Sequence, residues 1–296
     1  MSSIERYIDK LSNASVDSAA TPSDSASDAH SGVVTPAAEP RAGHQTTQQE
    51  VVIDFDRLKS AGMLTPDAGG GRLADEYRAI KRPLLKNAFG EGAVPISRGN
   101  LIMITSALPG EGKSFTSIGL AISMAKELDR TVLLVEADVA KPAICRYCGI
   151  PEPERGLVDY LADPEVDMSD LLLKTNVPKL TILPAGRQHA LTAELLGSLA
   201  MRDLMAQLAN RYPDRVVIFD SPPLLVSNDA VTLSALMGQV VVVVEAARTS
   251  QAQVKQAIAL LDPDQTVGIV LNKNRTSEGA GYGGYGYGYG AAGRGE

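Results

Sequence analysis

The segment LIMITSALPGEGKSF, residues 101–115, constrains the fold of this chain more than any other part of its 296-residue sequence. Its first five residues favour a buried strand. The residues from Ala107 to Ser114 match the P-loop pattern, with Ala107 in place of the first glycine. A helix-forming segment follows directly. The sequence therefore predicts a strand, a phosphate-binding loop and a helix in the order found in P-loop domains.

Further short apolar segments continue this pattern along the chain. Expected strands lie at 101–105, 131–136, 180–183, 216–219, 240–244 and 267–271, and the clearest expected helices lie at 114–127, 194–210 and 250–260. Another helical stretch begins at Arg72, and we expect Pro83 to kink or restart it. Short apolar strands alternating with helices indicate a parallel sheet buried on both faces. The predicted fold class is α/β: a parallel-sheet P-loop NTPase domain with helices on both faces.

The glycine loop contains the residue types that bind a nucleoside triphosphate. Gly110 and Gly112 allow backbone N–H groups to turn toward a phosphate, and the helix that follows adds its positive dipole end. Lys113 would reach the β- and γ-phosphates, and Ser114 would ligate Mg²⁺. We expect ATP to contact the loop through Pro109, Gly110, Glu111, Gly112, Lys113, Ser114 and Phe115.

Two carboxylates follow expected strands. Asp138 comes just after segment 131–136, and Asp220 comes directly after segment 216–219. Each should lie at the carboxyl edge of the sheet, where open α/β folds bind ligands. Mg²⁺ prefers oxygen ligands, so a hydroxyl and two carboxylates form a suitable set. We assign catalytic roles to Lys113, Asp138 and Asp220, and Mg²⁺ coordination to Ser114, Asp138 and Asp220.

The two ends of the chain differ in composition from its centre. Residues 1–50 contain an expected short amphipathic helix and then a linker rich in Ser, Ala, Thr, Asp and Gln, which we expect to be disordered. Residues 51–273 form the expected P-loop domain. Residues 274–296 contain GYGGYGYGYG, and so much glycine disfavours a helix or a packed strand. We expect a flexible tail with exposed phosphoacceptors at Tyr282, Tyr285, Tyr287 and Tyr289.

The position of this tail follows from the expected topology. The last strand, 267–271, should run parallel to the strand that enters the P-loop, because the sheet is expected to be parallel throughout. The carboxyl ends of parallel strands meet at one edge of the sheet. The tail should therefore leave the domain beside the nucleotide site.

Composition excludes several functional classes. The net charge of −7 gives no support for nucleic-acid binding. No run of about 18 apolar residues is present, and the first residues lack the apolar stretch of a signal peptide. Cysteine occurs at two positions, so a reducing cytoplasm is the expected compartment.

The chain contains three motifs in the order SALPGEGKS, VEADVAKP and VIFDSPP. In this order it resembles, over roughly residues 74–273, the bacterial tyrosine autokinases (BY-kinases), which carry the Walker motifs A, A′ and B in the same order. The segment DEYRAIKRPLL is similar to the Glu-x-x-Arg-x-x-Arg helix of that family, and the tail is similar to its tyrosine cluster. Two segments, YRAIKRPLL and LPAGRQHALTAELL, further resemble the subgroup found with exosortase-linked exopolysaccharide loci. The A′ motif of the family contains an arginine that this chain lacks, and the neighbouring Lys141 is expected to stand in for it.

The resemblance implies an ATP-dependent protein-tyrosine kinase that regulates exopolysaccharide synthesis or export. It implies a ring-like homo-oligomer with phosphorylation between copies, formed through the helix at about 72–88 with Asp75, Arg78 and Lys81. It also implies a separate membrane adaptor of the polysaccharide chain-length type, which recruits the protein from the cytoplasm to the inner membrane face. Asn272 is similar to an asparagine that contacts the base in related ATPases. Asp138 is our candidate for accepting the proton of the tyrosine phenol.

Two alternatives remain open at this stage. A regulatory ATPase of the MinD/ParA type shares the MinD/ParA-like fold, but it carries a lysine early in the P-loop where this chain has Leu108. An iron–sulfur carrier ATPase is suggested by the spacing of Cys145 and Cys148. Such clusters usually need four ligands, so we expect these two cysteines to pack in an ordinary helix.

Overall fold

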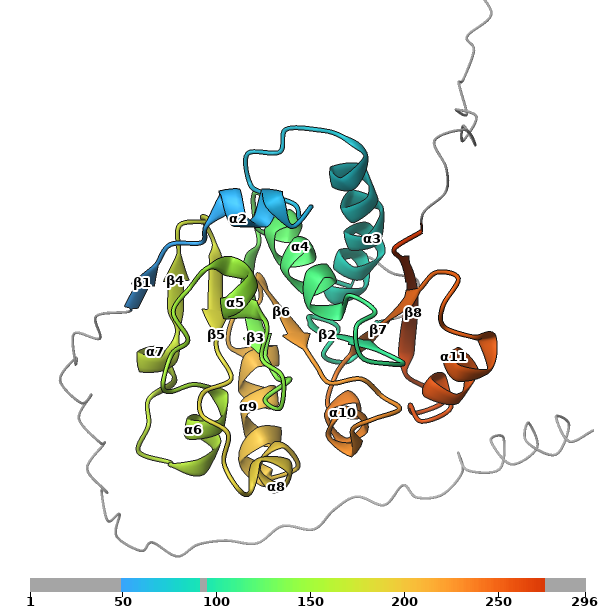
Figure 1. Ribbon diagram of the computed structural model, residues 1–296. Helices are drawn as coiled ribbons and strands as arrows, with labels where there is room; N and C mark the ends of the chain where they lie inside the picture. Colours follow the sequence, from blue (N-terminus) through green and yellow to red (C-terminus); the bar gives the residue numbers. More distant parts are fainter. Residues whose placement is uncertain (1–48, 91–94, 275–296) are drawn as a thin grey trace, which may run out of the picture. The chain divides into compact units, whose positions relative to one another are not determined.

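The computed structural model contains one eight-stranded sheet with the strand order β1-β4-β5-β3-β6-β2-β7-β8 (Figure 1). It describes residues 49–90 and 95–274, all of which belong to the unit that spans residues 45–296. The expected N-terminal helix, most of the linker and the tyrosine tail lie outside the described residues. The strands are β1 Gln49–Val51, β2 Leu101–Ser106, β3 Thr131–Glu136, β4 Leu173–Thr175, β5 Leu180–Leu183, β6 Arg215–Asp220, β7 Gln239–Glu245 and β8 Thr266–Asn272.

The six predicted strands are confirmed as β2, β3, β5, β6, β7 and β8. Every pair of adjacent strands within this set is parallel. The expectation of a wholly parallel sheet is wrong at one edge, where β4 pairs antiparallel with β5 and β1 pairs parallel with β4. Only residues 176–179 connect β4 to β5, and a parallel crossover needs a dozen residues or more. A connection this short permits only antiparallel pairing.

Helices cover both faces of the sheet, as predicted (Figure 1). Alternate residues of each central strand face opposite sides, so Ile102 and Ile104 belong to one core and Leu101 and Met103 to the other. The first core lies under α2 Phe55–Ser60, α3 Arg72–Ala88, α4 Lys113–Ala125 and α5 Ile144–Cys148. The second lies under α6 Leu157–Ala162, α7 Met168–Leu171, α8 Thr192–Leu196, α9 Leu199–Asn210, α10 Asn228–Ser234 and α11 Gln251–Ile258.

Two helix predictions need correction. The single helix expected at 194–210 is divided into α8 and α9, because Gly197 ends α8 and the hydroxyl of Ser198 caps α9 by accepting from the N–H of Met201. Of the kink or restart expected at Pro83, the restart does not occur, since α3 is one helix of 17 residues with Pro83 inside it, and the kink stays a prediction. Its buried residues lie on both sides of that proline, so packing against α4 holds the helix together.

Helix α3 is joined to the P-loop helix α4 by two buried side chains. The Tyr77 ring lies over Gly119, where a Cβ atom would be 2.1 Å from Cζ of Tyr77, and the Tyr77 hydroxyl donates to the carbonyl of Phe115 at 3.2 Å. The Lys81 ammonium donates to the carbonyl of Ser123 at 2.7 Å and pairs with Glu127. Tyr77 and Lys81 therefore hold α3 against α4 at two successive positions along α4.

Asp75, Arg78 and Lys81, the three residues of α3 expected to take part in oligomerisation, differ in exposure. Asp75 and Arg78 form an exposed ion pair on the outer surface of α3. Lys81 is 7% exposed and points inward to α4, because its ammonium finds a helix carbonyl and a carboxylate there. Lys81 is therefore not on the exposed surface of α3 that carries Asp75 and Arg78.

Strand β8 forms an edge of the sheet, and its pairing among the described residues is with β7 alone. Ile269 and Leu271 project from it with exposed fractions of 55% and 60%. Among the described residues, no helix is long and apolar enough to cross a membrane.

Candidate active site

The loop between β2 and α4 has the backbone geometry that the P-loop pattern predicts. Gly110 and Gly112 adopt φ values of 87° and 99°, in the left-handed region that favours glycine, and α4 begins at Lys113. A Cβ atom on Gly112 would lie 2.1 Å from Nδ2 of Asn272, so glycine is also required for space. The loop and the first turn of α4 thus leave backbone N–H groups available to a phosphate.

Glu111 supports the loop from behind. Its side chain is buried, and its carboxylate accepts from the N–H of Leu108 at 2.6 Å, from the N–H of Glu245 at 3.2 Å and from the hydroxyl of Thr249. We expected Glu111 to contact the nucleotide, but the contacts of its side chain are with protein. Only its backbone is available to a ligand. No sequence pattern indicates this role, because Glu245 and Thr249 are more than 130 residues away.

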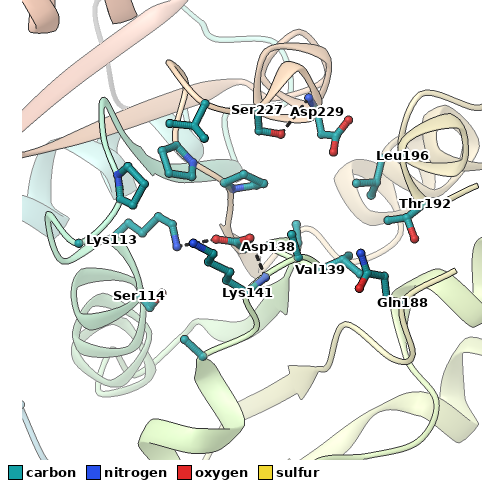
Figure 2. Close-up of a pocket in the computed structure, with 18 of the residues that line it drawn as sticks. Lys113, Ser114, Asp138, Val139, Lys141, Gln188, Thr192, Leu196, Ser227 and Asp229 are labelled. Carbon is teal, nitrogen blue, oxygen red and sulfur yellow. Dashed lines mark hydrogen bonds and ion pairs between the residues drawn. The ribbon is translucent and has the colours of Figure 1, made fainter. Parts of the chain in front are cut away.

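Lys113 and Asp138 face each other across the site (Figure 2). The distance from Nζ of Lys113 to Oδ2 of Asp138 is 2.7 Å, and both side chains are largely buried. Burial acts to lower the pKa of Lys113, but the carboxylates of Asp220 and Asp138 outweigh it and raise the pKa above its usual value. Lys113 is therefore a cation in this site. The structure brings these two predicted residues together.

Asp220 lies beneath this pair and is fully buried. Its Oδ1 accepts from the hydroxyl of Ser117 at 3.1 Å, whereas Oδ2 has no hydrogen-bond partner among the described residues. Burial raises the pKa of Asp220 to about 6, although Lys113 and nearby hydroxyls act to lower it. The backbone carbonyl of Asp220 also accepts from the N–H groups of Ala137 and Asp138, which fixes the two strand ends together.

The site has a donor set suited to Mg²⁺ with its waters. An unpartnered buried carboxylate oxygen is costly unless a cation or a water satisfies it, and Oδ2 of Asp220 is such an atom. Ser114 lines the cavity that Lys113 and Asp138 also line, whereas Asp220 is buried behind the lining residues. No group of three or more acidic, histidine or cysteine side chains suited to a metal occurs in the described residues, so Mg²⁺ would depend on water and phosphate for its other ligands.

Glu136 is a site residue that the sequence motifs alone did not reveal. It is 1% exposed, and its carboxylate accepts from the N–H groups of Ala143 and Ile144 at 2.8 and 2.9 Å. Burial, with a contribution from Asp220, raises the pKa of Glu136 to about 8. Its place at the end of β3, two residues before Asp138, could have suggested it. Glu136 anchors the segment that carries Asp138 to the start of α5.

A cavity of about 770 Å³ is lined by most of the predicted nucleotide-site residues, although Glu111 and Asp220 are not among its lining residues. The glycine loop forms one side of it, and Asp138, Val139 and Lys141 line it from the end of β3. Figure 2 shows Gln188, Thr192 and Leu196 on the wall across from Lys113, with Ser227 and Asp229 near α10. The cavity is larger than a phosphate group requires. It therefore has room for a nucleotide and for part of a second reactant.

The described chain ends on the P-loop. Strand β8 is parallel to β7, and β7 is parallel to β2, so the expected direction of the last strand is confirmed. Asn272 donates from Nδ2 to the carbonyl of Glu111 at 2.8 Å, and Lys273 donates from Nζ to the carbonyl of Gly110 at 2.6 Å. Asn272 lies in the cavity wall as expected, but its Nδ2 donates to the loop, so contact with a base stays a prediction.

The cysteines do not form an exposed thiol pair. Cys145 and Cys148 lie in α5 with exposed fractions of 4% and 1%, within the core beneath α3 and α4. Burial raises the pKa of each thiol to about 12, which opposes the thiolate form that metals and redox partners require. The packing interpretation is confirmed, and the iron–sulfur carrier interpretation has no support from this geometry.

Comparisons with known proteins agree with the motifs. The family described as AAA domain matches residues 99–267. The tyrosine-protein kinase YwqD of Bacillus subtilis is 34% identical over 208 residues, which cover 69% of this chain and 83% of that protein. The tyrosine-protein kinase ptk of Acinetobacter johnsonii is 31% identical over 180 residues, or 61% of this chain. The matched region spans only 24% of that longer relative.

Solved structures give the same result for the fold. The VpsO kinase domain superposes with a TM-score of 0.54 at 30% identity, covering 66% of this chain and 98% of that domain. The kinase domain of the Escherichia coli tyrosine kinase ETK superposes with a TM-score of 0.61 at 26% identity, covering 73% of this chain and 81% of that domain. The similarity thus extends over most of the described residues.

Proposed function

The chain belongs to the bacterial tyrosine-protein kinase family, and from that premise we propose that it transfers the γ-phosphoryl group of ATP to tyrosine, with its own C-terminal cluster as an acceptor. The proposed acceptors are Tyr282, Tyr285, Tyr287 and Tyr289. Its proposed role is to regulate exopolysaccharide synthesis or export. The name of a relative supports this role, since the succinoglycan biosynthesis transport protein ExoP of Rhizobium meliloti is 31% identical over 241 residues.

One observation carries the proposal: the last described residues contact the P-loop backbone. Asn272 and Lys273 donate to the carbonyls of Glu111 and Gly110. From Asn274, an extended chain would reach at most about 29 Å at Tyr282 and about 54 Å at Tyr289. A glycine-rich coil would span on the order of 15–20 Å over the same intervals. These lengths suit delivery of a phenol to the site of a neighbouring copy or to the same site.

The mechanism assigns separate tasks to the site residues. ATP would lie against the N–H groups of the glycine loop and of the first turn of α4, where the helix dipole favours negative charge. Lys113 would leave Asp138 for the β- and γ-phosphates, because two phosphate groups offer it more negative charge than one carboxylate. Mg²⁺, held by Asp220, by Ser114 and through water by Asp138, would neutralise charge on the phosphate oxygens.

The departure of Lys113 has a consequence for Asp138. Oδ2 of Asp138 bonds to Lys113 in the structure, and it becomes an acceptor for another proton donor once that bond breaks. In the proposed reaction, the phenol oxygen bonds to the γ-phosphorus, the bond from that phosphorus to the β–γ bridging oxygen breaks, and ADP leaves. The phenol proton passes to Asp138. The base would therefore be available only when nucleotide is bound.

The partners that we propose are those implied by membership of the family, and the exposed residues of α3 are the proposed contact surface. We propose a ring-like homo-oligomer that uses the exposed ion pair of Asp75 and Arg78, with phosphorylation between copies. Lys81 is assigned to the attachment of α3 to α4 instead, since it is buried there. A membrane adaptor of the polysaccharide chain-length type would recruit the protein from the cytoplasm to the inner membrane face.

Intact-mass analysis tests the proposal directly. Purified protein incubated with MgATP should gain phosphate, while Lys113→Met and a variant with four tail tyrosines changed to phenylalanine should gain little or none. Asp138→Asn should gain it at least about 100-fold more slowly, in line with loss of a general base. Lys255→Met, on the exposed surface of α11, is the matched control. Wild-type protein that hydrolyses ATP but never gains phosphate would instead indicate a regulatory ATPase.

A further inference from the structure

The junction between the P-loop and the end of β8 contains contacts that the proposed reaction does not use. Lys273 donates from Nζ to the carbonyl of Gly110 at 2.6 Å and to Oε2 of Glu245 at 3.0 Å. Asn272 donates from Nδ2 to the carbonyl of Glu111 at 2.8 Å. The carbonyls of two consecutive loop residues are thus held by two consecutive residues of the last strand end.

The conformation of Lys273 indicates that these contacts determine the local backbone. Its φ value is 56°, in the left-handed region that residues with a Cβ atom seldom adopt. This turn directs the lysine side chain back onto the loop. Glu245 fixes the ammonium from the other side, while the N–H of Glu245 donates to the buried carboxylate of Glu111. The strand ends of β7 and β8 and the loop therefore form one connected network.

Holding a carbonyl also orients the N–H of the next residue. A peptide unit is planar and trans, so its C=O and N–H bonds point in opposite directions. The hydrogen bond from Lys273 to the carbonyl of Gly110 therefore directs the N–H of Glu111 away from Lys273. In the same way, the hydrogen bond from Asn272 to the carbonyl of Glu111 directs the N–H of Gly112 away from Asn272. No acceptor pairs with either N–H within residues 49–90 and 95–274.

We propose that Lys273 and Asn272 are positioning residues of the phosphate site, which hold the Glu111 and Gly112 N–H groups toward the β- and γ-phosphates of a bound nucleotide. Both residues line the same cavity, and in the proposed role they act on the loop through the carbonyls of Gly110 and Glu111. The inference rests on the nucleotide-binding part of the proposed function and not on the identity of the phosphoacceptor.

The test measures nucleotide affinity in the full chain. A fluorescent ADP analogue is titrated with MgCl₂ present into wild type, Lys273→Met, Lys273→Arg and the control Lys255→Met. We expect Lys273→Met to weaken binding about tenfold, because one charge-assisted hydrogen bond to the loop is lost. Lys273→Arg, which keeps the donor, should bind within about twofold of wild type. Asn272→Leu should weaken binding in the same direction as Lys273→Met.

Two further readouts separate positioning from a general structural role. The melting temperature of each variant without nucleotide should lie within about 2 °C of wild type, and Lys273→Met should raise KM for ATP with little change in kcat. The inference is overturned if Lys273→Met binds the nucleotide analogue with wild-type affinity. It is also overturned if the fall in affinity is matched by a fall in the stability of the nucleotide-free variant. If the wild type binds ADP and this variant does too, only the inference fails. If the wild type binds no nucleotide, the proposed function fails as well.

Discussion

The contact between Tyr77 and Gly119 predicts that one substitution changes stability in opposite directions in two backgrounds. A Cβ atom at position 119 would lie 2.1, 2.3 and 2.7 Å from Cζ, the hydroxyl oxygen and Cε1 of Tyr77. These separations are too short for any pair of atoms that are not bonded, and Tyr77 is 4% exposed, so its ring cannot move freely. In the wild-type background, Gly119→Ala must therefore displace the ring.

The expected magnitudes follow from three effects. Overpacking a buried contact costs about 1–3 kcal/mol. Loss of the hydrogen bond from Tyr77 to the carbonyl of Phe115 costs about 1 kcal/mol. Alanine in place of glycine inside a helix stabilises it by about 1 kcal/mol. The net change for Gly119→Ala is a loss of about 1–3 kcal/mol in the free energy of unfolding. In Tyr77→Leu, which lacks the three colliding atoms, only the helix effect remains, and Gly119→Ala should stabilise by about 1 kcal/mol.

Urea unfolding followed by circular dichroism, on the two single variants and the double variant, measures this sign change. Gly197→Ala is the matched control, since the atom nearest to a Cβ at position 197 is 3.6 Å away and little change is expected. The reasoning is refuted if Gly119→Ala has the same effect in both backgrounds. A destabilisation that persists with Tyr77→Leu would mean that the ring is not what requires glycine at position 119.

Three more predictions concern buried polar groups. Because the pKa of Glu136 is raised from 4.5 to about 8 on folding, its contribution to stability is fully present below pH 4.5 and is lost as the pH rises through about 8. The free energy of unfolding, measured by chemical unfolding, should therefore fall as the pH rises across this range, and Glu136→Gln should make this fall smaller. Lys81→Met should lower the free energy of unfolding by about 1–3 kcal/mol, whereas Arg78→Met, in an exposed pair, should lower it by less than about 1 kcal/mol; equal losses would contradict the assignment of Lys81 to the core. The thiols of Cys145 and Cys148 should react with a chromogenic disulfide reagent slowly in buffer and rapidly in urea, and fast reaction in buffer would show that they are accessible.

The sequence predicted most of the central sheet because its strands are apolar, longer than three residues and mostly separated by helices. It also placed Lys113 and Asp138 in one site, since a P-loop lysine and a carboxylate after a neighbouring strand lie at one edge of the sheet. It did not predict β1 and β4, which have three residues each and no apolar pattern of their own. Nor did it predict the orientation of Lys81, since the charge of a side chain does not determine which face of a helix packs.

The supporting residues of the site were the hardest to predict. Glu111 was expected at the nucleotide because it lies within the P-loop motif, and that stays a prediction for its backbone, but the hydrogen bonds that its carboxylate accepts from Glu245 and Thr249 were not predicted. Lys273 was not identified, although it lies next to Asn272. Both roles depend on contacts between residues more than 130 positions apart in the sequence. Such contacts become visible only when the strand order is known.

The exposed edge of β8 affects how any assembly of this protein should be studied. Within residues 49–90 and 95–274, β8 pairs on one side alone, and a strand with such an edge and half-exposed aliphatic side chains is a template for pairing with another chain. Concentrated preparations can therefore associate through Ile269 and Leu271 without any involvement of α3. Sizing experiments on Asp75 or Arg78 variants accordingly require a companion with Ile269→Lys, so that association through the sheet edge is not mistaken for a ring.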